Sequence, residues 1–77
     1  MEKELDIMDR KPVSSSNIKA IGYNEEENLL EIEFQTGAVY QYQGVNILLF
    51  NELMSASSIG SFFAKTIKYQ FATNKIE

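Results

Sequence analysis

The stretch Phe34-Gln35-Thr36-Gly37-Ala38-Val39-Tyr40-Gln41-Tyr42 decides the fold of this chain. Within it, Thr36-Gly37 predicts a hairpin turn, because glycine accepts the positive φ that hairpin loops require. Alternate residues of a strand point to one face, so the rings of Tyr40 and Tyr42 are expected side by side. Two adjacent rings can stack nucleic-acid bases, or they can form half of a hydrophobic core.

The length of the hairpin loop determines which residues face the tyrosines. A two-residue loop places both rings opposite acidic residues of the preceding strand. A three-residue loop with a bulge at Gly37 places Tyr40 opposite Ile32 and Tyr42 opposite Leu30, which makes this face apolar. We favour the three-residue loop, because each face of the hairpin is then consistent in polarity. The opposite, solvent-exposed face would carry Glu31, Glu33, Gln35, Val39, Gln41 and Gln43.

The segments around the hairpin predict an α+β fold. Strands are expected at residues 18–23, 30–35 and 38–43, from their β-prone composition and from the alternation of apolar and polar residues. Apolar residues recur at spacings of three and four after Asn46, which predicts a helix capped by Asn46 that ends near residue 56. A second short helix is expected at 62–67. The predicted architecture is a three-stranded antiparallel β-meander followed by two short helices packed on one face of the sheet.

The chain is predicted to form one domain. It has 77 residues, 44% of them hydrophobic, which is enough for a packed core. Residues 1–12 are polar and unpatterned, and we interpret them as a flexible N-terminal leader before a single domain at 13–77. Tyr69-Gln70-Phe71 is expected to fold back onto this domain. Two helices over a three-stranded sheet supply the second layer that such a sheet needs to bury one face.

The composition excludes several kinds of chemistry. The chain has no cysteine and no histidine, so it has no thiolate metal site, no thiol nucleophile and no imidazole base. The three adjacent glutamates at 25–27 lack the spaced oxygen ligands of a calcium loop. Serine and lysine alone, without an adjacent activating base, do not make a plausible active site. We therefore expect a protein that is not an enzyme and uses no cofactor or metal.

The charges alternate along the chain. The net charge is −4, which argues against general binding to a phosphate backbone. Residues 25–33 hold five glutamates, whereas residues 53–76 hold three lysines and no acid. A local basic patch is therefore compatible with the sequence, beside the simpler interpretation of ordinary surface charge. No secretory signal or apolar stretch of membrane-spanning length is present, so we expect no membrane association and a cytoplasmic location.

The chain resembles the KTSC family, a small domain named for its occurrence at the C-terminus of some lysyl-tRNA synthetases. The resemblance covers roughly residues 12–71 and implies a small binding module without catalytic residues, for which RNA binding has been proposed. Asn46, Ile59 and Ala64 depart from the usual family pattern, where proline, lysine and asparagine are frequent. The matching elements are Val13-Ser14-Ser15-Ser16-Asn17-Ile18, Gly22-Tyr23, Thr36-Gly37, Val39-Tyr40-Gln41-Tyr42, Glu52-Leu53-Met54-Ser55-Ala56-Ser57-Ser58, Gly60-Ser61-Phe62-Phe63 and Ile67-Lys68.

The candidate ligand-binding residues fall into three groups. The first is the polar run Ser14, Ser15, Ser16 and Asn17, which either offers hydrogen bonds to an anion or organises its own turn. The second, our preferred locus, is the segment before the second helix, whose residues either bind a ligand or cap that helix. The third is the pair of tyrosines, for which the register favours packing in the core. The second group comprises Ser57, Ser58, Gly60 and Ser61, followed by Lys65 and Lys68.

These residues suggest three functions. The first is a non-catalytic module that binds RNA through Lys65, Lys68 and Lys19 together with the tyrosines. The second is an oligomeric protein of phage or mobile-element type that sequesters a small nucleotide or phosphorylated metabolite. The third is a protein-interaction module that uses an edge strand or the surface around Ile59 and Phe62.

Overall fold

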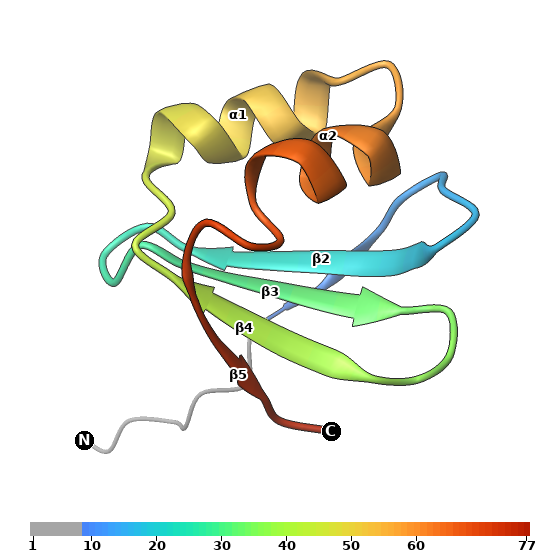
Figure 1. Ribbon diagram of the computed structural model, residues 1–77, viewed down its shortest axis with the longest axis horizontal. Coiled ribbons are helices and arrows are strands. Elements are labelled where there is room, and N and C mark those ends of the chain that lie inside the picture. Colours follow the sequence, from blue (N-terminus) through green and yellow to red (C-terminus); the bar gives the residue numbers. More distant parts are fainter. Residues whose placement is uncertain (1–8) are drawn as a thin grey trace.

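A five-stranded antiparallel sheet with two helices on one face makes up the described part of the chain, residues 9–77, in a computed structural model (Figure 1). The strands follow one another in the sheet in chain order, β1-β2-β3-β4-β5. Both helices lie between β4 and β5 in the sequence. The elements are β1 Lys11–Pro12, β2 Ile18–Asn24, β3 Leu29–Phe34, β4 Val39–Gln43, α1 Ile47–Ser55, α2 Ile59–Thr66 and β5 Ala72–Lys75.

The register of the central hairpin confirms the three-residue loop. In the pairing of β3 with β4, Ile32 lies opposite Tyr40 and Leu30 lies opposite Tyr42. The Phe34 N–H donates to the Ala38 carbonyl at 2.9 Å, which closes the loop. Gly37 has a φ of 99°, in the left-handed region where a side chain would be strained. Both tyrosines therefore lie on the face that the helices cover.

A bulge in β2 completes the apolar face. The register of β2 against β3 shifts between Ile18 and Ala20, so one extra residue is accommodated there. Without it, Ile18 and Ile21 would point to opposite faces, because strand side chains alternate. With it, both are buried in the same core cluster as Leu30 and Leu53. Strand alternation alone therefore does not determine which residues of β2 face the core.

The two helices cover this face through a few large apolar side chains. Asn46 caps α1, its side chain accepting a hydrogen bond from the Leu49 N–H at 2.9 Å, as predicted. Leu53 of α1 is fully buried, and Phe50 stacks on Tyr23 with ring centroids 4.3 Å apart. These contacts join α1 to the sheet and define the position of the helical layer.

Helix α2 is longer than predicted. It begins at Ile59 rather than near Phe62, because Ser58 serves as its N-cap and accepts a hydrogen bond from the Ser61 N–H at 3.3 Å. Residues 57–61 were predicted to separate the two helices, and this prediction is wrong for residues 59–61, which belong to α2. The inner face is as expected, since Phe63 and Ile67 are both buried in the core cluster.

The prediction of a three-stranded sheet is also wrong, because an edge strand is added on each side. Lys11–Pro12, which we assigned to the leader, pairs with β2 as β1. After α2 the chain returns and pairs Ala72–Lys75 with β4 as β5. All four residues of β5 are exposed, so no alternation of apolar and polar residues in the sequence predicts this strand. Residues 1–8 of the predicted leader lie outside the described residues.

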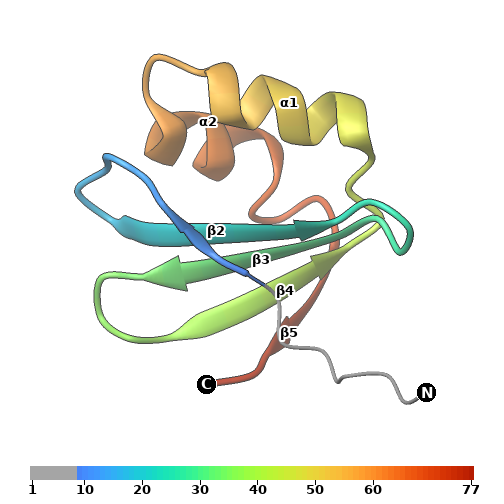
Figure 2. The same cartoon turned by 180° about the vertical axis from the view of Figure 1, so that it is seen from behind.

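The face of the sheet away from the helices is less open than expected. Glu31, predicted on a solvent-exposed face, is only 3% exposed, and Val39 is fully buried. The chain at β1 crosses this side of the molecule (Figure 2) and brings Arg10 into an ion pair with Glu31. Gln41 donates to the same carboxylate at 3.0 Å. The buried charge is thus paired and hydrogen-bonded, as burial of a carboxylate requires. No helix in residues 9–77 is long and apolar enough to cross a membrane.

Candidate functional site

Two adjoining hollows lie at the surface near the start of β2. The first has a volume of about 630 Å³, and aromatic side chains of β3 and β4 form much of its wall. The second has a volume of about 350 Å³ and is lined mainly by serines of the segment before β2 and of the start of α2. Ser16 and Asn17 line both. We call them the aromatic hollow and the serine hollow.

The aromatic hollow is built on the central hairpin. The rings of Tyr40 and Tyr42 stack with centroids 6.5 Å apart, and the Phe34 ring meets Tyr40 edge-on at 5.8 Å. Tyr42 also contacts Phe63 of α2 edge-on at 5.3 Å, which anchors the wall to the core. Tyr40 is half-buried, whereas Tyr42 is only 3% exposed. The rings therefore pack in or against the core, as the register predicts, and they also line a hollow.

Burial changes the acidity of the recessed tyrosine. Loss of solvation, with the neighbouring phenols of Tyr40 and Tyr69, raises the pKa of Tyr42 to about 12. Its hydroxyl therefore stays protonated at every physiological pH, because it would ionise only far into the alkaline range. The hydroxyl can donate or accept a hydrogen bond, but it contributes no charge to the hollow.

Polar groups line the aromatic hollow at the end near β2. The Gln35 side-chain amide nitrogen lies 3.4 Å from the carbonyl oxygens of both Ser15 and Ile18 and donates to them. Two carbonyl oxygens on the same side determine the orientation of this amide, since its own oxygen would repel them. Asn17 and Thr36 line the same end of the hollow.

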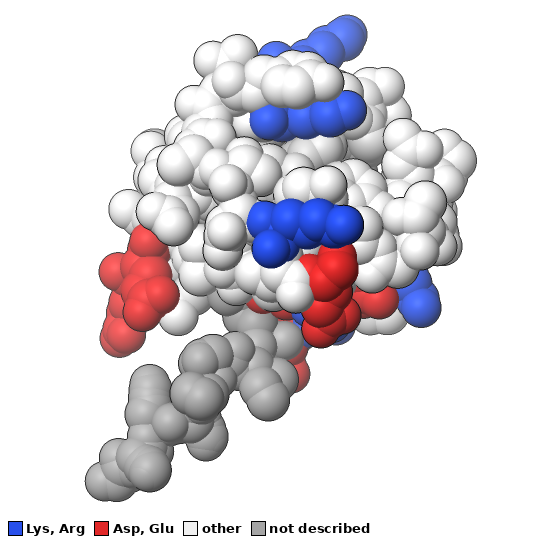
Figure 3. All heavy atoms as spheres, turned by 60° about the horizontal axis from the view of Figure 1, so that its bottom comes forward, with Lys and Arg blue, Asp and Glu red and all other residues white. Residues whose placement is uncertain are grey.

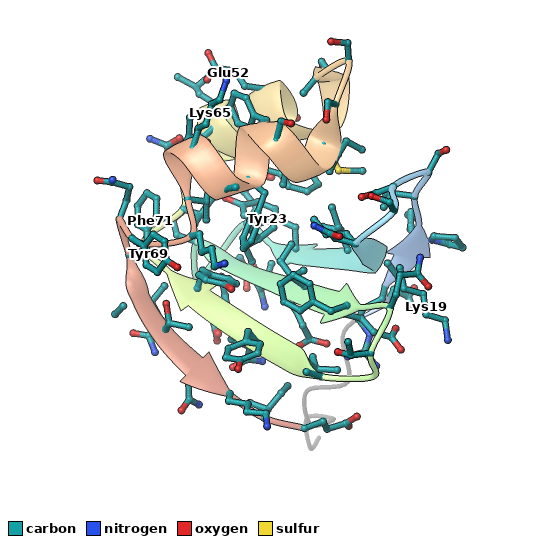
Figure 4. The ribbon with its side chains drawn as sticks, turned by 45° about the vertical axis from the view of Figure 1, so that its right-hand side comes forward. Lys19, Tyr23, Glu52, Lys65, Tyr69 and Phe71 are labelled. Carbon is teal, nitrogen blue, oxygen red and sulfur yellow. The ribbon has the colours of Figure 1, made fainter. Side chains whose placement is uncertain are left out.

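A cation and an exposed ring lie on another part of the rim. The Lys68 Nζ is 5.2 Å from the centre of the Tyr69 ring, within the range of a cation–π contact. Tyr69 is 82% exposed. It lies near Phe71 in the connection from α2 to β5 (Figure 4), which runs past this side of the sheet. Lys68 is the only charged residue that lines the hollow in the described part of the chain.

The serine hollow joins two of the predicted groups that are far apart in the sequence. The segment before β2 and the start of α2 form its two sides, and Ile59 and Ala64 of α2 also line it. A β-carbon at Gly60 would lie 3.3 Å from the Ser15 hydroxyl oxygen, so the two sides approach closely there. The predicted residues that line this hollow are Ser14, Ser15, Ser16, Asn17, Ser57, Ser58, Gly60 and Ser61.

Two serine hydroxyls of this hollow already accept hydrogen bonds from the backbone. The Ser15 oxygen accepts from the N–H groups of Asn17 and Ile18, each at 3.2 Å. The Ser58 oxygen accepts from Ser61 as the cap of α2. These serines therefore organise their own turn and helix, as we considered from the sequence. Ser15 retains only its own proton for a ligand, whereas Ser58 retains its proton and one acceptor lone pair.

The lysines of the first hypothesis do not form one patch. Lys65 lines neither hollow and lies on the outer side of α2 near Glu52 of α1 (Figure 4). Lys19 lies near the start of β2 but lines neither hollow, and its Nζ is 3.9 Å from a carboxylate oxygen of Glu33. Seen from the side of β5, basic side chains lie one above another with uncharged surface between them (Figure 3). Of the three lysines, only Lys68 adjoins the aromatic hollow.

Several residues of the aromatic hollow were not candidates in the sequence. Phe34, Gln35 and Thr36 were treated as parts of a hairpin, and nothing in their spacing marks a ligand site. Tyr69 and Thr73 reach the hollow only because the chain returns after α2 to pair with β4. One sequence signal was available, namely the adjacency of Tyr69 and Lys68 in a segment without acids. In residues 9–77, no cluster of three or more acidic, histidine or cysteine side chains is suited to hold a metal ion.

Known proteins are similar to this chain in sequence, and a solved structure is also similar in fold. The chain superimposes on the crystal structure of a KTSC domain protein from Yersinia pestis with a TM-score of 0.88 and 45% identity, over 92% of this chain and 100% of that one. An uncharacterized protein of Stutzerimonas stutzeri is 36% identical over 82% of this chain and 89% of its own length. A lysine–tRNA ligase of Nostoc is 41% identical over 73% of this chain, but the match covers 10% of the ligase.

The family model agrees with these relatives. The KTSC domain matches residues 14–71, from the serine run before β2 to Phe71 at the end of the connection toward β5. The matched range includes both sides of the serine hollow and most of the aromatic hollow. This chain therefore belongs to the KTSC domain family.

Proposed function

We propose that this KTSC domain is a non-catalytic module that binds RNA at the aromatic hollow. The observation that supports the proposal best is the combination of aromatic walls with a single cation on the rim. Base faces stack on aromatic side chains regardless of base identity, and each stacked base contributes roughly 1–3 kcal/mol. Lys68 supplies a positive charge where the sugar-phosphate backbone of a stacked nucleotide would leave the hollow.

The charge distribution around the hollow supports this proposal better than the net charge does. The whole chain has a net charge of −4, but no acidic residue lines the aromatic hollow in the described residues. Glu31 and Glu33 lie on the other side of the sheet, where Arg10 pairs with both. Repulsion of a phosphate is therefore weaker at the hollow than the total charge implies.

The relatives offer a further reason to consider RNA. A segment similar to this chain forms part of a protein named as a lysine–tRNA ligase. A domain that accompanies such a ligase and carries exposed aromatic surface is suited to contact tRNA or another RNA. We extend this association to the present chain as part of the proposal.

A salt series of binding to RNA tests the proposal. We expect a short, fluorescently labelled RNA to bind at about 50 mM salt and to be released as the salt concentration rises, because phosphate contacts release counterions. Loss of one phosphate contact in Lys68→Gln should reduce the slope of log affinity against log salt by about 1. Fluorescence anisotropy of the labelled RNA measures both quantities.

The matched control is Lys11→Gln, since Lys11 lies in β1 at the opposite edge of the sheet from β5. This variant makes the same change in net charge, so an equal effect of both substitutions would assign binding to net charge rather than to the hollow. Absence of binding by the unmodified protein at about 50 mM salt, where electrostatic contacts are strongest, would refute the proposal.

A second candidate function is the sequestration of a small phosphorylated metabolite or nucleotide in the serine hollow. The observation that favours it is the meeting of two serine-rich segments around one polar hollow, without a charged residue in its lining. Hydroxyl protons and backbone N–H groups can bind a phosphate without positive side chains. Native mass spectrometry of freshly purified protein tests it, with gel filtration for the oligomeric state. A monomer that retains no ligand argues against this function.

A further inference from the structure

We infer that the aromatic hollow accepts one unpaired nucleobase, so that the domain recognises single-stranded RNA and unpaired bases in preference to an intact duplex. The inference rests on the proposed function and specifies its substrate class. Three features of the hollow support it: the recessed position of its rings, the hydrogen-bonding capacity at its polar end, and the single charge on its rim.

The rings of the hollow are recessed from the surface. Tyr42 is almost fully buried and Tyr40 is half-buried, so a partner must enter the hollow to contact their ring surfaces. In a duplex each base face is covered by its neighbours in the stack, and exposing it requires unstacking. An unpaired base can be turned out of its strand and inserted between this wall and the exposed ring of Tyr69. The volume of about 630 Å³ lies in the range of pockets that hold small ligands, which suits one nucleoside rather than a helix.

The polar end of the hollow is suited to a free base edge. Because the Gln35 amide nitrogen donates to the carbonyls of Ser15 and Ile18, its oxygen is the group left to meet a ligand. No hydrogen bond to this oxygen occurs in residues 9–77. Each of the four bases has an N–H donor on its Watson–Crick edge, and base pairing in a duplex occupies it. The second amino proton of a paired adenine, cytosine or guanine faces a groove of the duplex, where a recessed acceptor does not reach it. An acceptor inside the hollow therefore favours unpaired over paired bases, with little preference among the four.

The charge at the hollow is too small for duplex recognition. Proteins bind double-stranded RNA through phosphate and 2′-hydroxyl contacts spread over successive grooves. Here Lys68 is the only cation that lines the hollow in the described part of the chain, and Lys19 is paired with Glu33. One cation can contact the phosphate beside a single inserted base. Affinity must then come mainly from stacking, which the duplex form of the same RNA does not offer.

The experiment compares three forms of one short RNA by competition against a labelled single strand. The forms are the single strand, its fully paired duplex, and the same duplex with one bulged, unpaired nucleotide. We expect the paired duplex to compete about five- to a hundredfold less well than the single strand, since it forfeits the stacking contribution of one base. The bulged duplex should recover most of this difference.

Two variants connect the result to the hollow. Tyr69→Leu removes an exposed ring without disturbing the core and should weaken binding of the single strand by roughly five- to a hundredfold, the equivalent of one lost stacking contact. Tyr40→Leu should have a similar effect, and its circular dichroism spectrum shows whether the fold is kept. Leu48→Ala changes an exposed residue of α1 outside both hollows and should bind like the unmodified protein.

The possible outcomes separate this inference from the proposed function. The paired duplex could bind as well as the single strand, with Lys68→Gln weakening the binding of both. The domain would then bind RNA, but the insertion of an unpaired base into the hollow would be refuted. The inference also fails if the bulge restores nothing, or if Tyr69→Leu behaves like Leu48→Ala. If no form of the RNA binds, the proposed function and the inference fall together.

Discussion

The aromatic hollow and the serine hollow share Ser16 and Asn17 but are built from different kinds of side chain. In the serine hollow the hydroxyls of Ser15 and Ser58 are used by the backbone, one in a turn and one in a helix cap. In the aromatic hollow the rings contribute to the core on one side and line the hollow on the other.

This difference shows how a polar and an apolar surface should be judged as binding sites. A hydroxyl has few hydrogen bonds to offer, so a cap or a turn uses much of its capacity. A ring has two faces and an edge, and packing in the core uses only part of them. A motif rich in serines can therefore mark local structure, while a residue that packs in the core can still line a surface hollow.

The largest expected effect separates the structural roles of the two hollows. Tyr42→Ala should lower the free energy of unfolding by about 3–5 kcal/mol, because it removes a buried ring that contacts Phe63. Ser57→Ala, at an exposed position of the serine hollow, should change it by less than about 0.5 kcal/mol. Urea denaturation measures both. Similar losses of unfolding free energy in the two variants would contradict the distinction between the aromatic hollow, whose wall belongs to the core, and the serine hollow, whose wall belongs to the surface.

The alkaline stability of the protein tests the burial of Tyr42. Its pKa is raised from 10.0 in the unfolded chain to about 12 in the fold, so between these values the unfolded state has lost more of the phenolic proton. The free energy of unfolding should therefore fall as pH rises from about 10 to 12, by at most about 2–3 kcal/mol from this group. Below about pH 10 the contribution of Tyr42 is fully present.

Tyr42→Phe provides the control, because phenylalanine does not titrate and has nearly the same shape. The difference in unfolding free energy between the unmodified protein and this variant should decrease from about pH 10 to about pH 12, as the contribution of Tyr42 to stability is lost. Other tyrosines and the lysines contribute equally to both proteins. Parallel pH curves would show that Tyr42 is solvated like an ordinary surface phenol.

The smallest effect concerns the serine hollow. Ser58→Ala removes the cap of α2 and should lower the free energy of unfolding by about 1 kcal/mol. Ser58→Thr keeps a capping hydroxyl and should retain most of this stability. The affinity for RNA should stay unchanged in both variants, since Ser58 does not line the aromatic hollow. Urea denaturation and anisotropy give the two values. A loss of RNA affinity without a loss of stability would transfer the binding site to the serine hollow.

Local sequence patterns were sufficient to predict the central hairpin and its surroundings. The register followed from the requirement that Leu30, Ile32 and the tyrosines share a face, and the cap at Asn46 followed from its position before an apolar stripe. The site was harder to predict. The two serine groups were found separately, but they line one hollow only because α2 packs beside the start of β2. Tyr69 reaches the aromatic hollow only because the chain returns after α2 to pair with β4.

The sequence by itself therefore determined the α+β class, the core of the hairpin and the exclusion of histidine and cysteine chemistry. These properties depend on the composition of the chain and on patterns that repeat every few residues, so no contact between distant segments is needed to predict them. Only the tertiary structure decided the edge strands, the burial of Glu31 beneath Arg10 and the composition of both hollows. Each of these arises between segments distant in the chain, because pairing at a sheet edge depends on a free neighbouring strand rather than on the pattern of the segment that pairs with it.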